Sequence, residues 1–561
     1  MKLMITKTKK HQFLYVTKSF RENGKCTSKI IEKLGTLECL LKTHSDPIAW
    51  AKEYAKKLTE QEKETGRTIM VGFSPIKIIG KDVTNSFNGG YLFMQKIYRQ
   101  LALHKICDDI TNRHKFDFDL DCIFSRLIYS RLIHPSSKLA TAGFSNKFVE
   151  QPNFDLHHIY RALEVISKES DFIQSELYKN SLTVCKRKTG ILYYDCTNYF
   201  FEIEEESGLK QYGYSKEHRP NPIVQMGLFM DADGMPLAFS ISAGNTNEQT
   251  TLVPIEKKIL QDFKLAKFIV CTDAGLSSLA NRKFNNEPGR GFITTQSIKK
   301  LVGHLESWAL EPTGWSVSGS DKLYDIREAA DLETVFYKSK WINEKGLSQK
   351  LIITYSLKYR EYQRVIRNAQ IDRALKAMKT DGAEKLPSNN FKRFIKKTSV
   401  TPDGEVASKT IYELDSKVVT EEEKYDGFYG TCTNLDDPAS EIIKINHRRW
   451  EIEECFRIMK SEFKARPIYL SRDDRIKAHF MTCFITLLIY RLLEKKLDGK
   501  FTCHQIIDGL RNMNFQKIRG EGYIPVYTRT NFTDALHEKF GFRTDYEIIT
   551  PECMRQLTTK H

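Results

Sequence analysis

The segment from residue 190 to residue 296 carries the hydrophobic pattern that most constrains the fold. It opens with G-I-L-Y-Y-D-C-T-N-Y-F-F-E, a β-branched and aromatic run that is typical of a strand. Two further apolar runs, I-V-Q-M-G-L-F-M and M-P-L-A-F-S-I-S, lie on either side of D-A-D-G. The pair Asp233-Gly234 favours a tight hairpin turn. Three consecutive strands are therefore expected.

The same segment then alternates between helix and strand. N-E-Q-T-T-L-V-P-I-E-K-K-I-L-Q-D-F predicts a helix, and K-F-I-V-C-T predicts a buried strand that leads into Asp273. A short helix and the strand G-F-I-T-T-Q complete the set. Three strands, a helix, a strand, a helix and a strand follow one another in the order of a ribonuclease-H-like sheet. We therefore predict an α/β fold with a ribonuclease-H-like mixed sheet as its core.

The remaining segments predict additions to this core. Residues 1–91 favour a lysine-rich β-hairpin and a helix with a possible role in DNA binding, and the region after them is mainly helical. Short strand-like pieces around a basic helix indicate a β-rich insertion domain. The expected boundaries are 92–185 for the helical DNA-binding or accessory domain, 186–297 and 441–500 for the two parts of the catalytic core, 298–440 for the insertion domain, and 501–561 for a C-terminal region without an expected role.

The charge balance favours a polyanionic partner. Lysine and arginine number 87 and aspartate and glutamate 71, so the formal net charge is +16 and the isoelectric point is near 9.1. Each phosphate that a lysine or arginine neutralises releases condensed counterions, which makes nucleic acid the leading candidate. Many basic proteins bind no nucleic acid, so the charge alone does not decide the function.

Cysteine spacing and hydropathy point to a cytoplasmic protein. The 12 cysteines are scattered singly, without the C-x-x-C pairs of a zinc site, and are expected to be reduced thiols. The longest apolar run, Phe480 to Tyr490, has 11 residues, whereas a membrane span needs about 20. The first residues lack the apolar stretch of a signal peptide. No contact with a membrane is expected.

Two aspartates follow apolar strand residues at similar positions. Asp195 comes after I-L-Y-Y, and Asp273 comes after F-I-V-C-T. Each could cap a turn or a helix, and each could instead bind a metal ion. If the two strands are neighbours, the carboxylates raise each other's pKa unless a cation lies between them. Oxygen ligands without histidine or cysteine favour Mg²⁺ or Mn²⁺ over Zn²⁺.

A third acid lies among basic residues in N-H-R-R-W-E-I-E-E-C-F-R-I-M-K-S-E-F-K-A-R-P, residues 446–467, which we expect to form one helix. At about 100° per residue, its cations fall within about 40° of Glu453 around the helix axis. These cations are Arg449, Arg457, Lys460 and Lys464. One explanation is a solvated face of i, i+4 ion pairs. The other is a site that combines an acid with several phosphate-binding side chains.

These motifs together resemble a known family. Arg449, Glu453 and Lys460 have the spacing of the tyrosine-arginine-glutamate-lysine signature of DDE transposases from bacterial insertion sequences, in the group with a β-rich insertion before the third acid. Y-Y-D-C-T and C-T-D-A-G-L are similar to the strands that carry the first two acids of this family. G-Y-S-K-E-H-R-P-N and G-N-T-N-E-Q-T-T-L also resemble it. The resemblance covers roughly residues 190 to 490.

The resemblance implies a site for two divalent ions, Mg²⁺ or Mn²⁺, held by Asp195, Asp273 and Glu453. Such ions activate water or a DNA 3′-hydroxyl for in-line attack on a phosphodiester. Arg449 and Lys460 would then bind phosphates of the DNA end. The further DNA-binding candidates are Lys464, Arg457, His218 and Arg219.

The sequence departs from the family pattern at several positions. The signature tyrosine is replaced by Asn446, with His447 as a candidate substitute. Glu217 and Asn221 stand where aspartates are more usual, and the prolines around them also favour a purely structural turn. A tryptophan of the insertion could hold a flipped base or simply belong to the core. The two tryptophans concerned are Trp308 and Trp315.

We therefore expect a cut-and-paste DNA transposase of a bacterial insertion sequence. It would bind double-stranded DNA with terminal inverted repeats, act on target DNA, and work as a homodimer on paired ends in the cytoplasm, associated with the nucleoid. Two alternatives stay open. One is an inactive, transposase-derived DNA-binding or regulatory protein, and the other is a host nuclease on the same fold.

Overall fold

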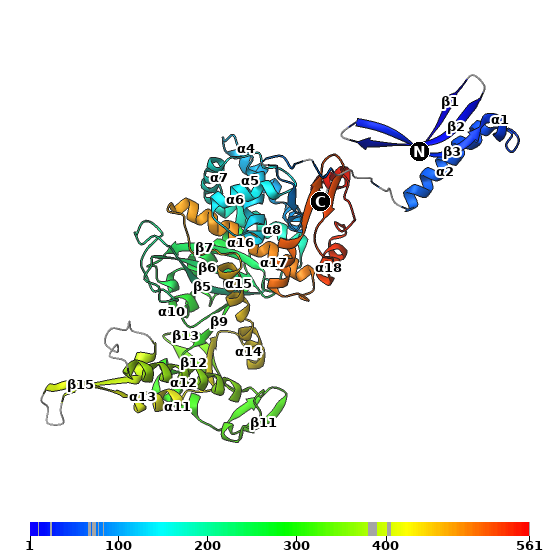
Figure 1. Cartoon of the computed structure of the whole chain (residues 1–561). Helices are drawn as coiled ribbons and strands as arrows, with labels where there is room; N and C mark the ends of the chain where they lie inside the picture. Colours follow the sequence, from blue (N-terminus) through cyan, green and yellow to red (C-terminus); the bar gives the residue numbers. More distant parts are fainter. Residues whose placement is uncertain are drawn as a thin grey trace. The chain divides into compact units, whose positions relative to one another are not determined.

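The computed structural model describes residues 1–8, 11–22, 25–65, 69, 74–76, 78–81, 83–379, 390–400 and 406–559 (Figure 1). The chain forms two compact units. One unit consists of Met1–Val165 together with Ile489–His561, and the other consists of Ile166–Leu488. The protein has a mixed α/β fold.

A ten-stranded mixed sheet dominates the unit Ile166–Leu488. Its strands are β5 (Ile191–Phe200), β6 (Ile223–Asp231), β7 (Pro236–Ala243), β8 (Phe268–Thr272), β9 (Arg290–Gln296), β10 (Trp315–Val317), β11 (Ser320–Tyr324), β12 (Phe336–Glu344), β13 (Leu347–Tyr355) and β16 (Phe428–Thr433). They are arranged in the order β11-β10-β12-β13-β16-β9-β8-β5-β6-β7. β5, β8 and β9 are parallel, and every other neighbouring pair is antiparallel.

The five strands expected between residues 190 and 296 are confirmed. β6 and β7 form the predicted hairpin, and Gly234 in its turn has a φ of 71°, which glycine adopts at little cost. A buried ion pair fixes this turn, because Arg187 Nε donates to Asp231 Oδ2 over 2.5 Å. The same carboxylate accepts from the backbone N–H groups of Asp233 and Met235 at 3.0 and 3.1 Å.

The segment expected as an insertion domain continues the same sheet. β16 pairs with β9 from Gly430↔Gln296 to Thr433↔Ile293, and β13, β12, β10 and β11 follow outward from it. The predicted basic helix is α12 (Leu357–Lys379). β14 (Ile395–Val400) and β15 (Val406–Leu414) form a separate two-stranded ribbon. The remaining helices here are α11 (Gly303–Leu310) and α13 (Ser416–Glu423).

Side chains that alternate along β5 build two different layers. Leu192, Tyr194 and Cys196 pack in a core with α9 (Leu252–Asp262), whereas Tyr199 contacts Phe480 of α16 (Asp473–Lys496). α8 (Ser170–Val184) and α10 (Leu279–Phe284) complete the helices around the first five strands. Among the described helices, α16 alone is long and apolar enough to cross a membrane, but 89% of its apolar stretch is buried in the protein.

The other unit joins the two ends of the chain. Its helices are α3 (Tyr91–Gln100), α4 (Leu103–Arg113), α5 (Leu120–Ile133), α6 (Lys138–Phe144), α7 (Leu156–Lys168), α17 (Cys503–Asn512), α18 (Asn531–Phe540) and α19 (Pro551–Thr559). A small sheet of β18 (Gly522–Pro525), β17 (Asn514–Ile518) and β4 (Ser86–Asn88) links the N-terminal and C-terminal parts. Asn88 Nδ2 also donates to Leu510 O over 3.0 Å. The C-terminal region therefore completes the core of the N-terminal helices.

The first residues form a small antiparallel sheet. β2 (Gln12–Glu22) and β3 (Lys25–Thr36) are the expected hairpin, whose turn at residues 23 and 24 lies outside the described residues. The sequence pattern missed β1 (Lys2–Lys7), which pairs with β2. α1 (Leu37–Leu40) and α2 (Pro47–Thr65) follow, and Leu14, Leu40 and Ala51 form a small core among these elements.

Candidate functional site

The carboxylate of Asp195 lies near the middle of β5, on the face opposite to Tyr194 and Cys196. The backbone N–H of Cys196 donates to Asp195 Oδ1 over 2.7 Å. Burial raises the pKa of the Asp195 carboxyl to about 7, Lys216 opposes this shift, and Asp273 adds to it. A buried acid of this kind is ionised at neutral pH only when cations compensate its charge.

Asp273 follows β8, and the strand register brings it beside Asp195. In the parallel pair β5 and β8, Tyr193 lies opposite Cys271. Asp195 and Asp273 each come two residues after a member of this pair, so their side chains share one face of the sheet. Asp273 Oδ1 also accepts from Leu276 N over 3.0 Å. Asp273 therefore fixes the turn after β8 with one of its carboxylate oxygens.

Arg449 is a buried cation on which both aspartates act electrostatically. It precedes α15 (Trp450–Ser461), and its side chain is only 17% exposed. Arg449 Nη1 donates to Thr295 Oγ1 over 2.8 Å, while its Nε is buried without a hydrogen-bond partner among the described residues. Burial disfavours the charged guanidinium, but Tyr429 and Cys271, followed by the two aspartates, cause a net rise of its pKa. The arginine is thus held as a cation beside the two carboxylates.

Glu453 lies in the first turn of α15, and its side chain is 66% exposed. Its Oε1 is 3.9 Å from Arg449 Nη2. The three acids are not among the clusters of described residues in which ligand atoms all lie within 4.8 Å of one another. The structure therefore brings Asp195 and Asp273 together and links Glu453 to them through Arg449.

Lys460 reaches from α15 to the strand of the first acid. Its Nζ donates to Thr197 Oγ1 over 2.7 Å and lies 3.5 Å from Glu217 Oε1. Burial lowers the pKa of Lys460 to about 8, and the neighbouring cation Lys216 acts in the same direction. The ammonium group of Lys460 therefore lies between Glu217 and Thr197, and Thr197 is two residues after Asp195 on β5.

The expectation of one helix over residues 446–467 is wrong. α14 (Ala439–His447) ends before Arg448, and α15 spans only Trp450–Ser461. Asn446 is held by side-chain contacts at this break, because its Nδ2 donates to the Tyr429 hydroxyl over 3.2 Å. At the other end, Lys464 has a φ of 47°, which no helix contains. Of the four cations expected on one helix face, only Arg457 and Lys460 lie within α15, while Arg449 precedes it and Lys464 follows it.

Two of the expected basic residues lie apart from the acids. Arg457 donates from Nε and Nη2 to the carboxylate of Glu454, both over 2.7 Å. Its guanidinium is therefore used by an ion pair on another side of α15. Lys464 is exposed beyond the end of the helix.

His218 and Arg219 lie in the loop between β5 and β6. His218 is exposed with a φ of 54°. Arg219 stacks its guanidinium 4.1 Å from the ring centre of Phe200 at the end of β5. The loop is thus anchored to the strand that carries Asp195, and both basic side chains remain accessible.

Trp308 and Trp315 belong to the core of the insertion, whereas Trp341 on β12 is exposed. Trp315 is fully buried and donates from Nε1 to Glu311 O over 2.9 Å. Trp308 packs against the same hydrophobic cluster, and Lys338 lies over both rings. Trp315 therefore cannot stack on a base without unfolding of this core.

The sequence pattern missed several residues of the site. Lys216 donates to Cys196 O over 2.5 Å and lies 3.1 Å from Glu248. The hydroxyls of Tyr429 and Thr295 share a hydrogen bond of 2.5 Å. Tyr429 also contacts Asn446, and Thr295 also contacts Arg449, so the two hydroxyls connect these residues. Lys216 lies inside the motif S-K-E-H-R-P-N and could have been chosen there. Tyr429 and Thr295 lie within ordinary strand patterns, which carry no sign of their hydroxyl contacts.

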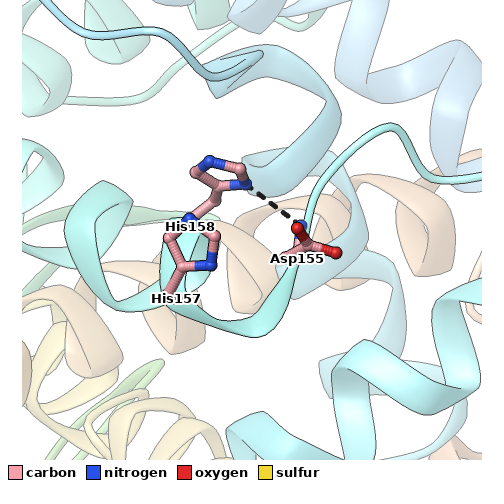
Figure 2. Close-up of side chains that lie close together, drawn as sticks. All are labelled: Asp155, His157 and His158. Carbon is pink, nitrogen blue, oxygen red and sulfur yellow. Dashed lines mark hydrogen bonds between the residues drawn. The ribbon is translucent and has the colours of Figure 1, made fainter.

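Two other clusters of possible metal ligands occur among the described residues, and both lie outside the unit of the sheet. Figure 2 shows Asp155, His157 and His158 at the start of α7. There the backbone N–H of Asp155 donates to His158 Nδ1 over 3.1 Å, so this ring nitrogen already accepts a hydrogen bond at the start of the helix. In the second cluster, Arg529 and Arg543 pair with Asp534 and Asp545 beside His537. The arginines compete there with any cation.

One family model matches the region that contains most of these residues. A family model described as "Transposase DDE domain" matches residues 198–489, slightly more than half of the chain. The match includes Asp273 and Glu453 and begins three residues after Asp195. A cryo-EM structure of a piggyBac transposase synaptic complex with hairpin DNA aligns over 84% of each chain at 8% identity, with a TM-score of 0.36. Curated proteins include no significant match.

The matched region runs from the end of β5 through the other nine strands of the sheet to α14 and α15, so it contains most of the site described above except Asp195 and Thr197. The chain therefore belongs to the family of transposases with a DDE domain.

Proposed function

We propose that this transposase belongs to an insertion sequence and that it cleaves DNA at the element's ends and joins them to target DNA. The observation that carries the proposal is the pairing of Asp195 and Asp273 on neighbouring strands, with Arg449 as their common cation. A protein that only binds DNA gains nothing from two carboxylates that face phosphates.

The topology supports a ribonuclease-H-like catalytic core. The strands β7, β6 and β5 are antiparallel, and β8 and β9 continue in parallel from β5. This is the arrangement expected from the order of strands and helices in the sequence. It supports Asp195 and Asp273 as the first two acids, since Asp195 lies on β5 and Asp273 directly follows the neighbouring strand β8.

The donor set suits a divalent metal ion. Burial and the charge of Asp273 both disfavour ionised Asp195, and a bound cation would reverse this. We propose Asp195, Asp273 and Glu453 as ligands of two Mg²⁺ or Mn²⁺ ions, because all three offer only oxygen. When bound, such ions supply Lewis-acid activation of the attacking water or 3′-hydroxyl and stabilise the leaving oxygen. The exposed side chain of Glu453 is free to turn toward the two aspartates.

The basic side chains bind and orient the DNA strand. Arg449 has an unused Nε and offers two edges of its guanidinium, which suits a phosphate. Lys460 donates to Thr197, two residues after Asp195 on β5, and so provides a positive charge near the first acid. Lys464, His218 and Arg219 are exposed and are proposed as outer DNA contacts. Arg457 is assigned no role, because Glu454 already occupies its guanidinium.

The proposed partners are double-stranded DNA with terminal inverted repeats, target DNA, and a second copy of the chain on paired ends. The lysine-rich sheet of β1, β2 and β3 supports a DNA-reading role for the N-terminal region. A bacterial cytoplasm with association to the nucleoid is the proposed location.

The test is a cleavage reaction with the purified chain, Mg²⁺ or Mn²⁺, and DNA that carries the two ends of the element. Wild-type protein should cut at the ends and join them to a second DNA. Asp195→Asn should bind the same DNA and leave it uncut. Binding without cleavage by the wild type would indicate an inactive, regulatory relative, and cleavage without joining would indicate a nuclease.

A further inference from the structure

Three cations converge on one carboxylate next to the proposed catalytic strand. Glu217 Oε1 lies 3.5 Å from Lys460 Nζ and is ion-paired with Arg466, and Glu217 Oε2 lies 3.6 Å from Arg219 Nε. We call Lys460, Arg466 and Arg219 the Glu217 cations. They come from three separate segments, namely α15, the stretch after it, and the loop between β5 and β6.

The protein backbone fixes this arrangement at the end of β5. Ile468 N donates to Phe200 O over 3.0 Å, which holds the segment of Arg466 beside the strand. Phe200 also lies beneath both guanidinium groups, 4.1 Å from that of Arg219 and 5.8 Å from that of Arg466. On the loop, Arg219 N donates to Ser215 Oγ over 3.2 Å. The cations are therefore positioned by the fold and not only by Glu217.

One carboxylate cannot balance three cations. Glu217 carries a single negative charge, and the nearby Glu248 lies 3.1 Å from the further cation Lys216. Asp195 also acts on Lys460, but burial disfavours its charge. Like charges held this close repel one another unless an anion lies between them. A phosphodiester group carries the same charge as Glu217 and offers more acceptor oxygens, so it suits the same position. Lys460 connects this position to Thr197 and hence to the strand of Asp195.

We propose that the Glu217 cations form a binding site for a phosphodiester of the DNA strand that enters the catalytic site, and that Glu217 holds this site as an internal anion until DNA replaces it. The inference rests on the proposed function. It adds Arg466 to the proposed DNA-binding residues. It also implies that Glu217 lowers the affinity for DNA. DNA must compete with Glu217 for the three cations, which weakens binding and favours strands that fit the site.

The experiment measures the affinity of the full chain for a fluorescent DNA duplex, in EDTA so that no cleavage occurs. Glu217→Gln keeps the side-chain shape and removes the charge. We expect its affinity to rise by roughly 3- to 30-fold, and the slope of log affinity against log salt to steepen by up to about 0.9, which corresponds to one additional phosphate contact. An unchanged or weaker affinity would overturn the proposal.

A matched control separates this effect from a general change in net charge. Glu176→Gln also removes one negative charge, and its side chain is 30% exposed, compared with 28% for Glu217. Glu176 pairs with Lys179 on α8, apart from the Glu217 cations. Its affinity for DNA should stay within about twofold of the wild type. An equal gain in both variants would attribute the effect to net charge and contradict the proposal.

A double-mutant cycle tests the link to Arg466. In an Arg466→Met background, Glu217→Gln should give a smaller gain in affinity, because one of the competing partners is absent. A gain of the same size in both backgrounds would exclude Arg466. Melting curves of all variants establish that they are folded, and Glu217→Ser, which shortens the side chain as well, should show the same direction of change.

Inorganic phosphate carries the same oxygens as a DNA strand. Added at constant ionic strength, it should displace little DNA, because an isolated anion lacks the neighbouring contacts of the strand. Efficient displacement, together with unchanged DNA affinity in Glu217→Gln, would identify a site for free phosphate instead.

The binding measurements do not depend on catalysis. A loss of cleavage activity with the gain in affinity retained would contradict only the proposed function.

Discussion

Arg449 donates a hydrogen bond from Nη1 to the hydroxyl of Thr295 over 2.8 Å, which ties the start of α15 to β9. The Thr295 hydroxyl also shares a 2.5 Å hydrogen bond with Tyr429 of β16. Strand β16 belongs to the segment expected as an insertion. The insertion thus contributes directly to the position of the arginine between Asp195, Asp273 and Glu453.

Replacement of Thr295 by valine tests this relationship. Valine keeps the shape and removes the hydroxyl, so Arg449 loses its anchor while the strand remains packed. We expect DNA cleavage to slow by roughly 10- to 100-fold, since a misplaced phosphate-binding group costs catalysis even when substrate still binds. The measurement is a single-turnover cleavage rate. Thr295→Ser should restore most of it, and a slow Thr295→Ser variant would show that packing rather than the hydroxyl matters.

The low pKa of Lys460 predicts a pH-dependent affinity for DNA. Burial lowers this pKa to about 8, so the free protein loses the charge of Lys460 as the pH rises through 8. A phosphate favours the protonated form, and the affinity should therefore fall by up to about tenfold between pH 7 and pH 9. Lys460→Arg keeps its charge over this range and should remove the decline.

Fluorescence titrations with duplex DNA in EDTA provide this measurement. Lys444→Arg is the matched control, because Lys444 pairs with Glu441 on the surface of α14. It should show the same decline as the wild type. A decline that persists in Lys460→Arg would assign the titration to another group.

Glu256 predicts that the folded protein loses stability as the pH rises. Its side chain on α9 is fully buried, and burial raises its pKa to about 8 although Asn285 Nδ2 donates to it over 2.8 Å. The unfolded chain releases this proton near pH 4.5, whereas the folded protein keeps it up to about pH 8. The unfolded state therefore binds fewer protons between these values, and stability falls as the pH rises.

Glu256→Gln is neutral at every pH and should not show this loss. Relative to the variant, the free energy of unfolding of the wild type should fall by roughly 2 to 4 kcal/mol between pH 5 and pH 8. Urea unfolding followed by tryptophan fluorescence measures the difference at both pH values. Parallel pH profiles of the two proteins would show that Glu256 is ionised in the folded state.

Local signals made much of the sheet predictable from the sequence. The Asp233-Gly234 turn, the apolar strands beside it and the two aspartates at equivalent strand positions are all visible in short stretches. The extension of the sheet was not visible. Strands such as β10 and β11 are only three and five residues long, and the pairing of β16 with β9 joins residues more than a hundred positions apart. Such long-range pairing leaves no periodic trace.

The break between α14 and α15 was unpredictable for a related reason. Residues 446–449 contain neither proline nor glycine, so their propensities allow a continuous helix. The tertiary contacts of Asn446 and the hydrogen bond from the Tyr193 hydroxyl to Ile445 O, 2.9 Å long, favour a break instead. At the far end, Lys464 adopts a left-handed conformation that costs a non-glycine residue about 1–2 kcal/mol. The spacing of Arg449, Glu453 and Lys460 nevertheless identified Glu453, which faces Arg449, and Lys460, which contacts Thr197 of β5.

The most direct test of the account compares two adjacent glutamates of α15. Glu453 faces Arg449, whereas Glu454 pairs with Arg457 on another side of the helix. The measurement is the single-turnover rate of cleavage of DNA with the element's ends in Mg²⁺, for Glu453→Gln and Glu454→Gln at equal DNA occupancy. The account predicts a loss of at least about a thousandfold for Glu453→Gln and a rate within about threefold of the wild type for Glu454→Gln. Wild-type cleavage by Glu453→Gln would contradict it.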